Sequence, residues 1–422
     1  MKKNTYHHLL MLLTALCSTI FLQTMQAQDC GCPGATMDRI EQVRDNNDSA
    51  ALQKLMGEWR NSSNKNCRVF AFTLDVWQLI SNRKIDTVLS IIQEQEKYVN
   101  SLPCKEQHLT QAYLNYTRYY KRKNDFENMS VWVYKALQHA EAQKDREGEL
   151  QAVKDLVYLF TRQNEDEKIP AYVKRAEKII AGLPENYLTG EHYNWLAFEY
   201  ETWYTREQRM SLVDSGAAFA DKAIVFSKKY QDPEQLTQSF RAFEAFSYHR
   251  GNLRQAVAYM DSALFYARQI KVNTSLGSLY LAKSSDLLDL GEKEEAMRWT
   301  DSSIFYAEKD FKHTPGTVNV YLQASQIYEA AGNLPKAFAV FKTYEHLKDS
   351  LFTLQRSEKI NELEQQYNKV KNEKTIKELA QQKRIYILLA LAGLLALIGL
   401  IFFIRQQSLR NKQKILETEQ RL

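Results

Sequence analysis

The chain has 422 residues, and 56 Lys and Arg nearly balance 51 Asp and Glu, for a formal net charge of +5. So small a net charge gives no reason to expect a nucleic-acid partner. Gly (14) and Pro (7) are sparse, and helix-forming residues recur throughout, so the composition predicts helix almost everywhere. The 24 Tyr and 19 Phe argue against a disordered chain.

Residues 1–27 have the features of an export signal. Two early lysines precede an apolar stretch over 9–22, and cleavage near Ala27 would start the mature chain at Gln28. An uncleaved anchor is the alternative. Under either interpretation the residues that follow are exported.

The cysteines of the exported part are Cys30, Cys32, Cys67 and Cys104. Four thiols in an exported chain indicate disulfides, with three connectivities open. A metal or redox site is the alternative, but no His lies near the first pair and its C-x-C spacing differs from C-x-x-C. We therefore expect disulfides that hold the first helical units together, and no metal site.

An internal repeat is the most informative feature of the chain. Short breaks recur every 40 to 42 residues, and each contains a residue that tolerates the left-handed conformation at a helix end. These residues are Asn82, Asn124 and Asn164 in the first half, and Gly251, Gly291 and Gly332 in the second. Twelve residues after four of the breaks stands a small residue: Ala136, Ala176, Ala263 and Ser303. A small side chain at a fixed place allows two helices to approach closely.

Three segments show the repeat directly: 219–229, 259–269 and 299–309. They align without gaps at a period of 40 residues, with Asp221, Asp261 and Asp301 in step.

This pattern resembles the tetratricopeptide repeat (TPR) family of helix-turn-helix units. The matching residues are Gly251, Ala256 and Ala263, then Gly291, Ala296 and Ser303, then Gly332 and Ala337. The family period is 34 residues, so the six or seven extra residues should lengthen helices or loops. The fourth unit, about 189–231, lacks the Gly or Asn and implies an insertion of some seven residues.

The resemblance covers residues 36–350 and implies an all-α fold. We expect a right-handed, TPR-like α-solenoid of seven to eight helical hairpins over 28–350, in which Met37–Arg60 form the first hairpin.

A linker helix is predicted over 351–384, which contains no Gly or Pro. Apolar residues follow heptad spacing at Ile360, Leu363, Tyr367 and Val370, break at Lys374, and resume at Ile376 and Leu379. A coiled coil normally needs three or four heptads, so a homodimer through this segment and a lone solvated helix are alternatives.

Residues 385–404 carry no charge, and at about 1.5 Å rise per residue they are long enough to cross a hydrocarbon core of roughly 30 Å. In the tail, 405–422, basic residues outnumber acidic ones, which is typical of a cytoplasmic flank. The sequence predicts a single-pass protein of the inner (cytoplasmic) membrane, with a periplasmic N-terminal region and a cytoplasmic tail.

Sequence motifs of catalysis are absent. There is no G-x-x-x-x-G-K-[ST], G-x-G-x-x-G, G-x-S-x-G or H-E-x-x-H, and the eight histidines are scattered. We therefore expect no enzyme activity, no catalytic residues and no cofactor.

An aromatic run in the fourth unit comprises Tyr193, Trp195, Phe198, Tyr200, Trp203 and Tyr204. Core packing between hairpins explains most of it. Only some of these rings share a face that can be buried, so one left exposed could line a ligand groove.

TPR arrays bind peptides or protein segments on the concave face of their first helices, and the resemblance places ligand-binding positions here. They are Gln111, Arg118, Lys121, Gln151, Lys154, Gln238, Arg241, Tyr248, Gln326 and Glu329. The carboxylate clamp of chaperone-binding TPR domains is not matched, because Lys154 is followed four residues later by Tyr158 rather than Asn.

The order of segments resembles the sensory half of bacterial TPR-containing sensor histidine kinases and membrane regulators, without an output domain. This implies a membrane-anchored periplasmic TPR protein that binds a protein or peptide partner and functions in signal sensing. A static envelope assembly scaffold and a truncated sensor histidine kinase are the alternatives.

Overall fold

The computed structural model describes residues 30–32, 39–40, 42–43, 49–81, 84–270, 276–311, 314–351, 376–387, 391, 401 and 403–411. The chain divides into two units, Met1–Phe341 and Lys342–Leu422. Within the described ranges the regular secondary structure is helical, with no strand.

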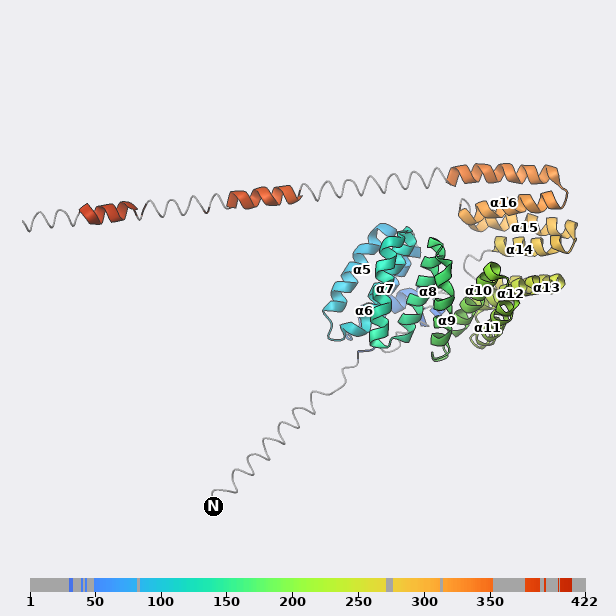
Figure 1. The fold of residues 1–422 in the computed structure, drawn as a ribbon, viewed down its shortest axis with the longest axis horizontal. Helices are drawn as coiled ribbons and strands as arrows, with labels where there is room; N and C mark the ends of the chain where they lie inside the picture. Colours follow the sequence, from blue (N-terminus) through green and yellow to red (C-terminus); the bar gives the residue numbers. More distant parts are fainter. Residues whose placement is uncertain are drawn as a thin grey trace, which may run out of the picture. The chain divides into compact units, whose positions relative to one another are not determined.

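The first unit is a series of antiparallel helix pairs (Figure 1). After α3 (Ser49–Arg60) the pairs are α4 (Cys67–Ser81) with α5 (Ile85–Asn100), α6 (Lys105–Lys123) with α7 (Phe126–Gln143), α8 (Arg146–Gln163) with α9 (Ile169–Ile180), α10 (Thr189–Glu207) with α11 (Met210–Lys229), α12 (Pro233–His249) with α13 (Leu253–Ala267), and α14 (Leu276–Asp289) with α15 (Lys293–Phe311). A short 3₁₀ helix, η1 (Asp166–Lys168), precedes α9, and α16 (Pro315–Ala330) is followed by helical residues from 334 onward. The predicted solenoid of helical hairpins is confirmed in this part of the chain.

The predicted breaks adopt the left-handed backbone conformation that closes a helix. Asn124 and Asn164 have φ of 53° and 58°, and the three glycines have φ of 78° to 91°. Asn82 lies outside the described residues. In the fourth unit Gln208 adopts φ 55° and ends α10, so this hairpin has the same turn without a Gly or Asn. The left-handed turn residues Asn164, Gln208 and Gly251 are 44 and 43 residues apart, so the extra residues are divided between the two intervals. The connection that precedes α10 runs over 181–188.

The small residues of the second helices are buried, as predicted. Ala136, Ala176, Ala263 and Ser303 are all 0% exposed. Ser303 Oγ also donates a hydrogen bond of 2.7 Å to the carbonyl of Gly277 on the preceding helix. A Cβ on Gly277 would lie 3.0 Å from the backbone of Ser303, so both positions require small residues.

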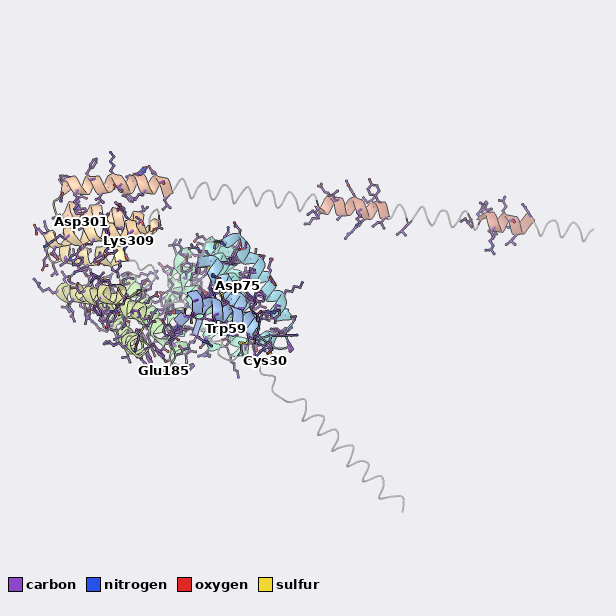
Figure 2. All side chains as sticks on the ribbon, turned by 180° about the vertical axis from the view of Figure 1, so that it is seen from behind. Cys30, Trp59, Asp75, Glu185, Asp301 and Lys309 are labelled. Carbon is purple, nitrogen blue, oxygen red and sulfur yellow. A yellow bond between two sulfur atoms is a disulfide. The ribbon has the colours of Figure 1, made fainter. Side chains whose placement is uncertain are left out.

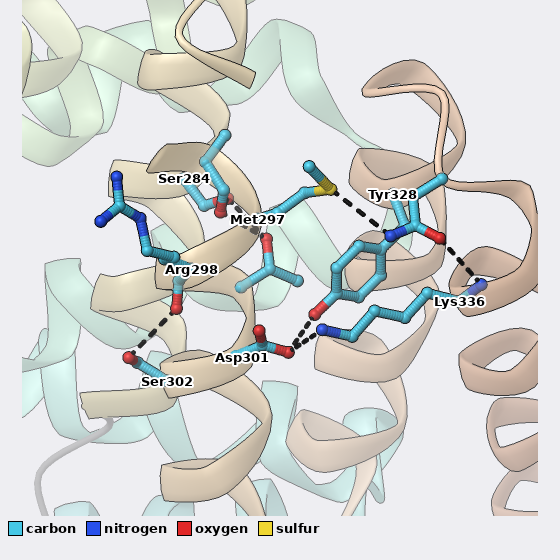
Figure 3. Close-up of polar contacts among 10 residues, drawn as sticks. Ser284, Met297, Arg298, Asp301, Ser302, Tyr328 and Lys336 are labelled. Atoms are coloured by element: carbon cyan, nitrogen blue, oxygen red, sulfur yellow. Dashed lines mark hydrogen bonds and ion pairs between the residues drawn. The ribbon is translucent and has the colours of Figure 1, made fainter. Parts of the chain in front are cut away.

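Two of the three aspartates shared by the repeats, Asp261 and Asp301, connect one hairpin to the next. Asp261 on α13 accepts a hydrogen bond of 2.6 Å from Lys283 on α14. Asp301 on α15 accepts one of 2.6 Å from the hydroxyl of Tyr328 on α16 and also pairs with Lys336 (Figure 3). In these two units the shared carboxylate therefore lies where it contacts the neighbouring unit.

Two disulfides close the N-terminal end of the first unit. Cys30 is bonded to Cys104 and Cys32 to Cys67, with Cα atoms 5.6 Å and 4.8 Å apart. A separate small core contains Cys32 and Cys67, and Figure 2 shows Cys30 beside the first helices. Cross-links over 74 and 35 residues stabilise a fold by about 2–4 kcal/mol each.

In the second unit, residues 376–387 and 403–411 are helical. Ile376 and Leu379, at predicted heptad positions, are 64% and 58% exposed. The other heptad positions, the signal peptide over 1–27 and most of the predicted span over 385–404 lie outside the described residues. Of the helices that the structure describes, none has the length and apolar character needed to span a bilayer.

Candidate binding groove on the first helices of the hairpins

Five of the ten predicted binding residues come together on two neighbouring helices. Gln111, Arg118 and Lys121 project from α6, and Gln151 and Lys154 from α8. These residues line two cavities of about 210 Å³ and 570 Å³. Both cavities share Gln151, Lys154 and Glu191, so they adjoin, and we call the surface that lines them the groove.

The first cavity lies between α4, α6, α8 and α10. Val69, Phe70, Leu114, Leu150 and Leu188 give it apolar walls. Helix α6 begins just after Cys104, so the disulfide fixes the start of one of the two helices that contribute most to the lining.

Two buried polar atoms of the first cavity lack a hydrogen-bond partner among the described residues: Gln111 Nε2 and His192 Nδ1. Burial, followed by the nearby Lys154 ammonium, lowers the pKa of His192 to about 3. The imidazole is therefore neutral near pH 7. A buried polar atom without a partner costs about 1–3 kcal/mol, and water or a ligand can offset that cost.

The cations of the groove, in contrast, have partners. Lys154 Nζ lies 2.9 Å from Glu191, and its side chain is 11% exposed. Arg118 stacks over Trp77, 4.6 Å from the ring centroid.

Lys121, one turn beyond Arg118 on α6, is also held by partners. Its Nζ lies 2.9 Å from Asp155 Oδ1 and 4.1 Å from the ring centroid of Tyr158. Gln151 Nε2 donates to the other oxygen of Asp155 at 3.2 Å. The side chains of α6 and α8 thus hold one another in place along the floor of the groove.

The second cavity contains the exposed part of the aromatic run. Tyr200 and Tyr204 are buried in the core, whereas Trp195 and Phe198 line the cavity, and Phe198 is 61% exposed. Part of this run is therefore buried in the core, and part of it lines the second cavity. Burial raises the pKa of Glu199, on the same lining, to about 7.

The other five predicted residues line neither cavity. Gln238 and Arg241 bond to each other on α12, and Tyr248 donates a 2.8 Å hydrogen bond to Asp289 on α14. Gln326 and Glu329 are exposed on α16.

Sequence reasoning missed two carboxyls between α12 and α14. Burial, and next the charge of Asp286, raise the pKa of Glu244 to about 8. Burial raises the pKa of Asp286 to about 7, and this residue is 3% exposed. Its Oδ2 has no hydrogen-bond partner within the described part of the chain. We call Glu244 and Asp286 the buried acid pair.

The first cavity and the buried acid pair occupy comparable places in the solenoid. Successive first helices pack directly at α4–α6, α6–α8, α10–α12 and α14–α16. The ion pair of Lys154 and Glu191 bridges α8 to α10, and the buried acid pair lies between α12 and α14. These are the two junctions where first helices approach less closely, which leaves room for polar groups.

Clusters of three or more His, Cys, Asp or Glu able to hold a metal ion do not occur among the residues described.

Comparison with solved structures places the fold among TPR-type α-solenoids. A signal transduction ATPase with numerous domains that carries a tetratricopeptide repeat sensor, from Pyrococcus horikoshii, matches with a TM-score of 0.55 and 14% identity. The match covers 74% of this chain and 47% of that one. The apo form of the quorum sensor NprR from B. thuringiensis matches with a TM-score of 0.53 and 12% identity over 81% of this chain and 95% of that one. No family model and no curated protein sequence matches the chain.

Proposed function

We propose that this protein binds an extended segment of a protein or peptide in the groove and acts as a membrane-anchored signal sensor. The observation that carries the proposal is the groove itself, in which α6, α8 and α10 line two adjoining cavities. Its mixture of apolar walls, paired charges and an exposed aromatic ring is typical of surfaces that bind peptides. The proposal assigns the groove a binding role and no catalytic one.

The membrane and signalling parts of the proposal rest on the sequence. Residues 1–27, as an export signal, and 385–404, as a span, would place the solenoid in the periplasm and residues 405–422 in the cytoplasm. Ligand binding would then change the curvature of the solenoid and bias the linker helix over 351–384.

The binding role is tested with peptides selected from a displayed random library by the full chain in lipid nanodiscs. Phe198→Ser removes an exposed ring from the second cavity, and we expect it to weaken the selected peptides about tenfold. Phe305→Ser is the matched control, because Phe305 is 60% exposed on α15 and lines neither cavity. Equal affinity of both variants for every selected peptide would show that the groove is not the binding site.

A static envelope scaffold is the second candidate function, since a solenoid can bind a partner without passing a signal. Deletion of residues 406–422 separates the two. A signal sensor loses its output while the solenoid still binds peptide, whereas a scaffold keeps its function.

A further inference from the structure

The first cavity is too small for a whole drug-sized ligand. Its volume of about 210 Å³ lies below the range of roughly 300–1,000 Å³ that such ligands require. The apolar walls contributed by Leu114, Leu150 and Leu188 favour an apolar group within that volume.

The groups in this cavity that need a partner are neutral. Gln111 Nε2 can only donate a hydrogen bond, so it requires an acceptor. His192 Nδ1 belongs to a neutral imidazole and can accept a hydrogen bond from an N–H group. A peptide unit supplies one carbonyl acceptor and one N–H donor, and so matches both.

An anionic ligand fits the cavity less well. Lys154 is already 2.9 Å from Glu191, and Glu191 itself lines the cavity and would repel a second carboxylate. Arg118 is engaged by Trp77 and donates a hydrogen bond to Asn115. A bound anion would compete with Glu191 for Lys154 and would lie near Asp145 and Glu147, which also line the cavity, whereas a neutral peptide unit uses the two atoms that lack a partner.

We propose that the first cavity is an anchor subsite for one apolar side chain of an extended partner segment, with a flanking backbone carbonyl accepting from Gln111 Nε2 and a flanking N–H donating to His192 Nδ1. This inference rests on the proposed binding function of the groove and specifies the chemistry of its occupant. Specificity arises from burial of the apolar side chain, and the two hydrogen bonds fix the direction of the segment.

The direct test uses blocked amino acids as minimal probes, with the full chain in lipid nanodiscs and NMR of the His192 ring. N-acetyl-leucine N-methylamide should bind saturably and at least fivefold more tightly than N-acetyl-glycine N-methylamide, because only the leucine side chain fills the apolar walls. Unblocked N-acetyl-leucine, which carries a carboxylate, should bind no better than its amide. Tenfold tighter binding of the carboxylate would overturn the proposal in favour of an anion site.

Two variants separate a binding role from a structural one. Gln111→Leu and His192→Phe remove the unpartnered atoms at similar volume, so each should weaken the leucine probe at least threefold without lowering the melting temperature of the free protein. Gln323→Leu, an exposed change on α16, should alter neither quantity. A lower melting temperature together with unchanged probe binding would show that these atoms serve the fold, and would overturn the proposal.

The peptides selected from the displayed library distinguish failure of this inference from failure of the groove. If they lose affinity with Phe198→Ser but not with Gln111→Leu, the groove binds peptide and the anchor subsite is wrong. If Phe198→Ser also has no effect on any of them, the proposed function itself fails.

Discussion

The groove between α6 and α10 and the buried acid pair between α12 and α14 place opposite chemistries on one repeating scaffold. In the groove, burial keeps a histidine neutral by lowering its pKa. In the buried acid pair, burial raises the pKa of Glu244 to about 8 and that of Asp286 to about 7, so both carboxyls titrate near neutral pH. Desolvation disfavours the charged form in both places. The histidine becomes charged as the pH falls, whereas the carboxyls become charged as the pH rises. One helical scaffold thus contains two regions that should weaken at opposite ends of the pH scale.

The largest expected effect comes from removing the titrating carboxyl of Glu244 from the buried acid pair. The folded-state pKa of Glu244 lies above its unfolded value, so its stabilising contribution is complete below about pH 4.5 and is lost as pH rises toward 8. Glu244→Gln should therefore raise the free energy of unfolding at pH 8 by about 1–2 kcal/mol, a figure reduced for the partial exposure of the side chain, and change it little at pH 5.

Urea unfolding at both pH values, with hydrogen exchange of the α12 and α14 amides, measures this effect. Glu329→Gln, an exposed change on α16, is the control and should leave the profile unchanged. A gain at pH 5 equal to that at pH 8 would mean that Glu244 is charged throughout, contrary to the comparison.

A smaller effect concerns the groove. The folded-state pKa of His192 lies below its unfolded value, so its contribution is present above about pH 6.5 and is lost as pH falls from there toward 3. His192→Phe should make unfolding less sensitive to acid, by about 1 kcal/mol at pH 5 relative to pH 7.

The exposed His346 provides the matched control as His346→Phe. Thermal unfolding between pH 5 and 7 follows both variants. The comparison fails if the acid sensitivity of His192→Phe equals that of the unmodified chain.

The smallest expected effect is on the pKa values of His192 and Glu199, which both respond to the charge of Lys154. The Lys154 ammonium lowers the pKa of His192 and also that of Glu199. Lys154→Met should raise both pKa values by a few tenths. Arg206→Met should raise only that of Glu199, since Arg206 acts on Glu199 and not on His192. NMR titration of both side chains measures the four values, and an unchanged pKa of Glu199 in Lys154→Met would exclude the coupling.

Local signals in the sequence were sufficient to predict most of the helical hairpins. Asn124 and Gly251 mark helix ends because their backbone tolerates positive φ, and Ala136 and Ala263 mark close helix contacts because they are small. The fourth turn was hidden because Gln208 carries no such signature and is held at positive φ by the packing of α10 on α11.

The site was predictable only in part. Gln111 and Lys154 were found from their places in the repeat, but His192 and Asp286 were not, because their burial depends on how closely neighbouring first helices approach. One signal in the sequence could have identified Glu244 of the buried acid pair. Glu201 lies seven positions before the left-handed turn residue Gln208, and Glu244 lies seven positions before Gly251. An acidic residue repeated at one register of two adjacent first helices indicates a shared polar position.

The disulfides give the solenoid a preferred direction of unravelling. An array of this kind loses structure from its ends, because a terminal unit has only one neighbour. Cys30–Cys104 and Cys32–Cys67 tether the N-terminal units, so fraying should begin at the opposite end, beyond α16. A mechanical pull or a protease would then reach α12 and α14 before α6 and α8. The half of the solenoid that contains the groove is thus the last part to come apart.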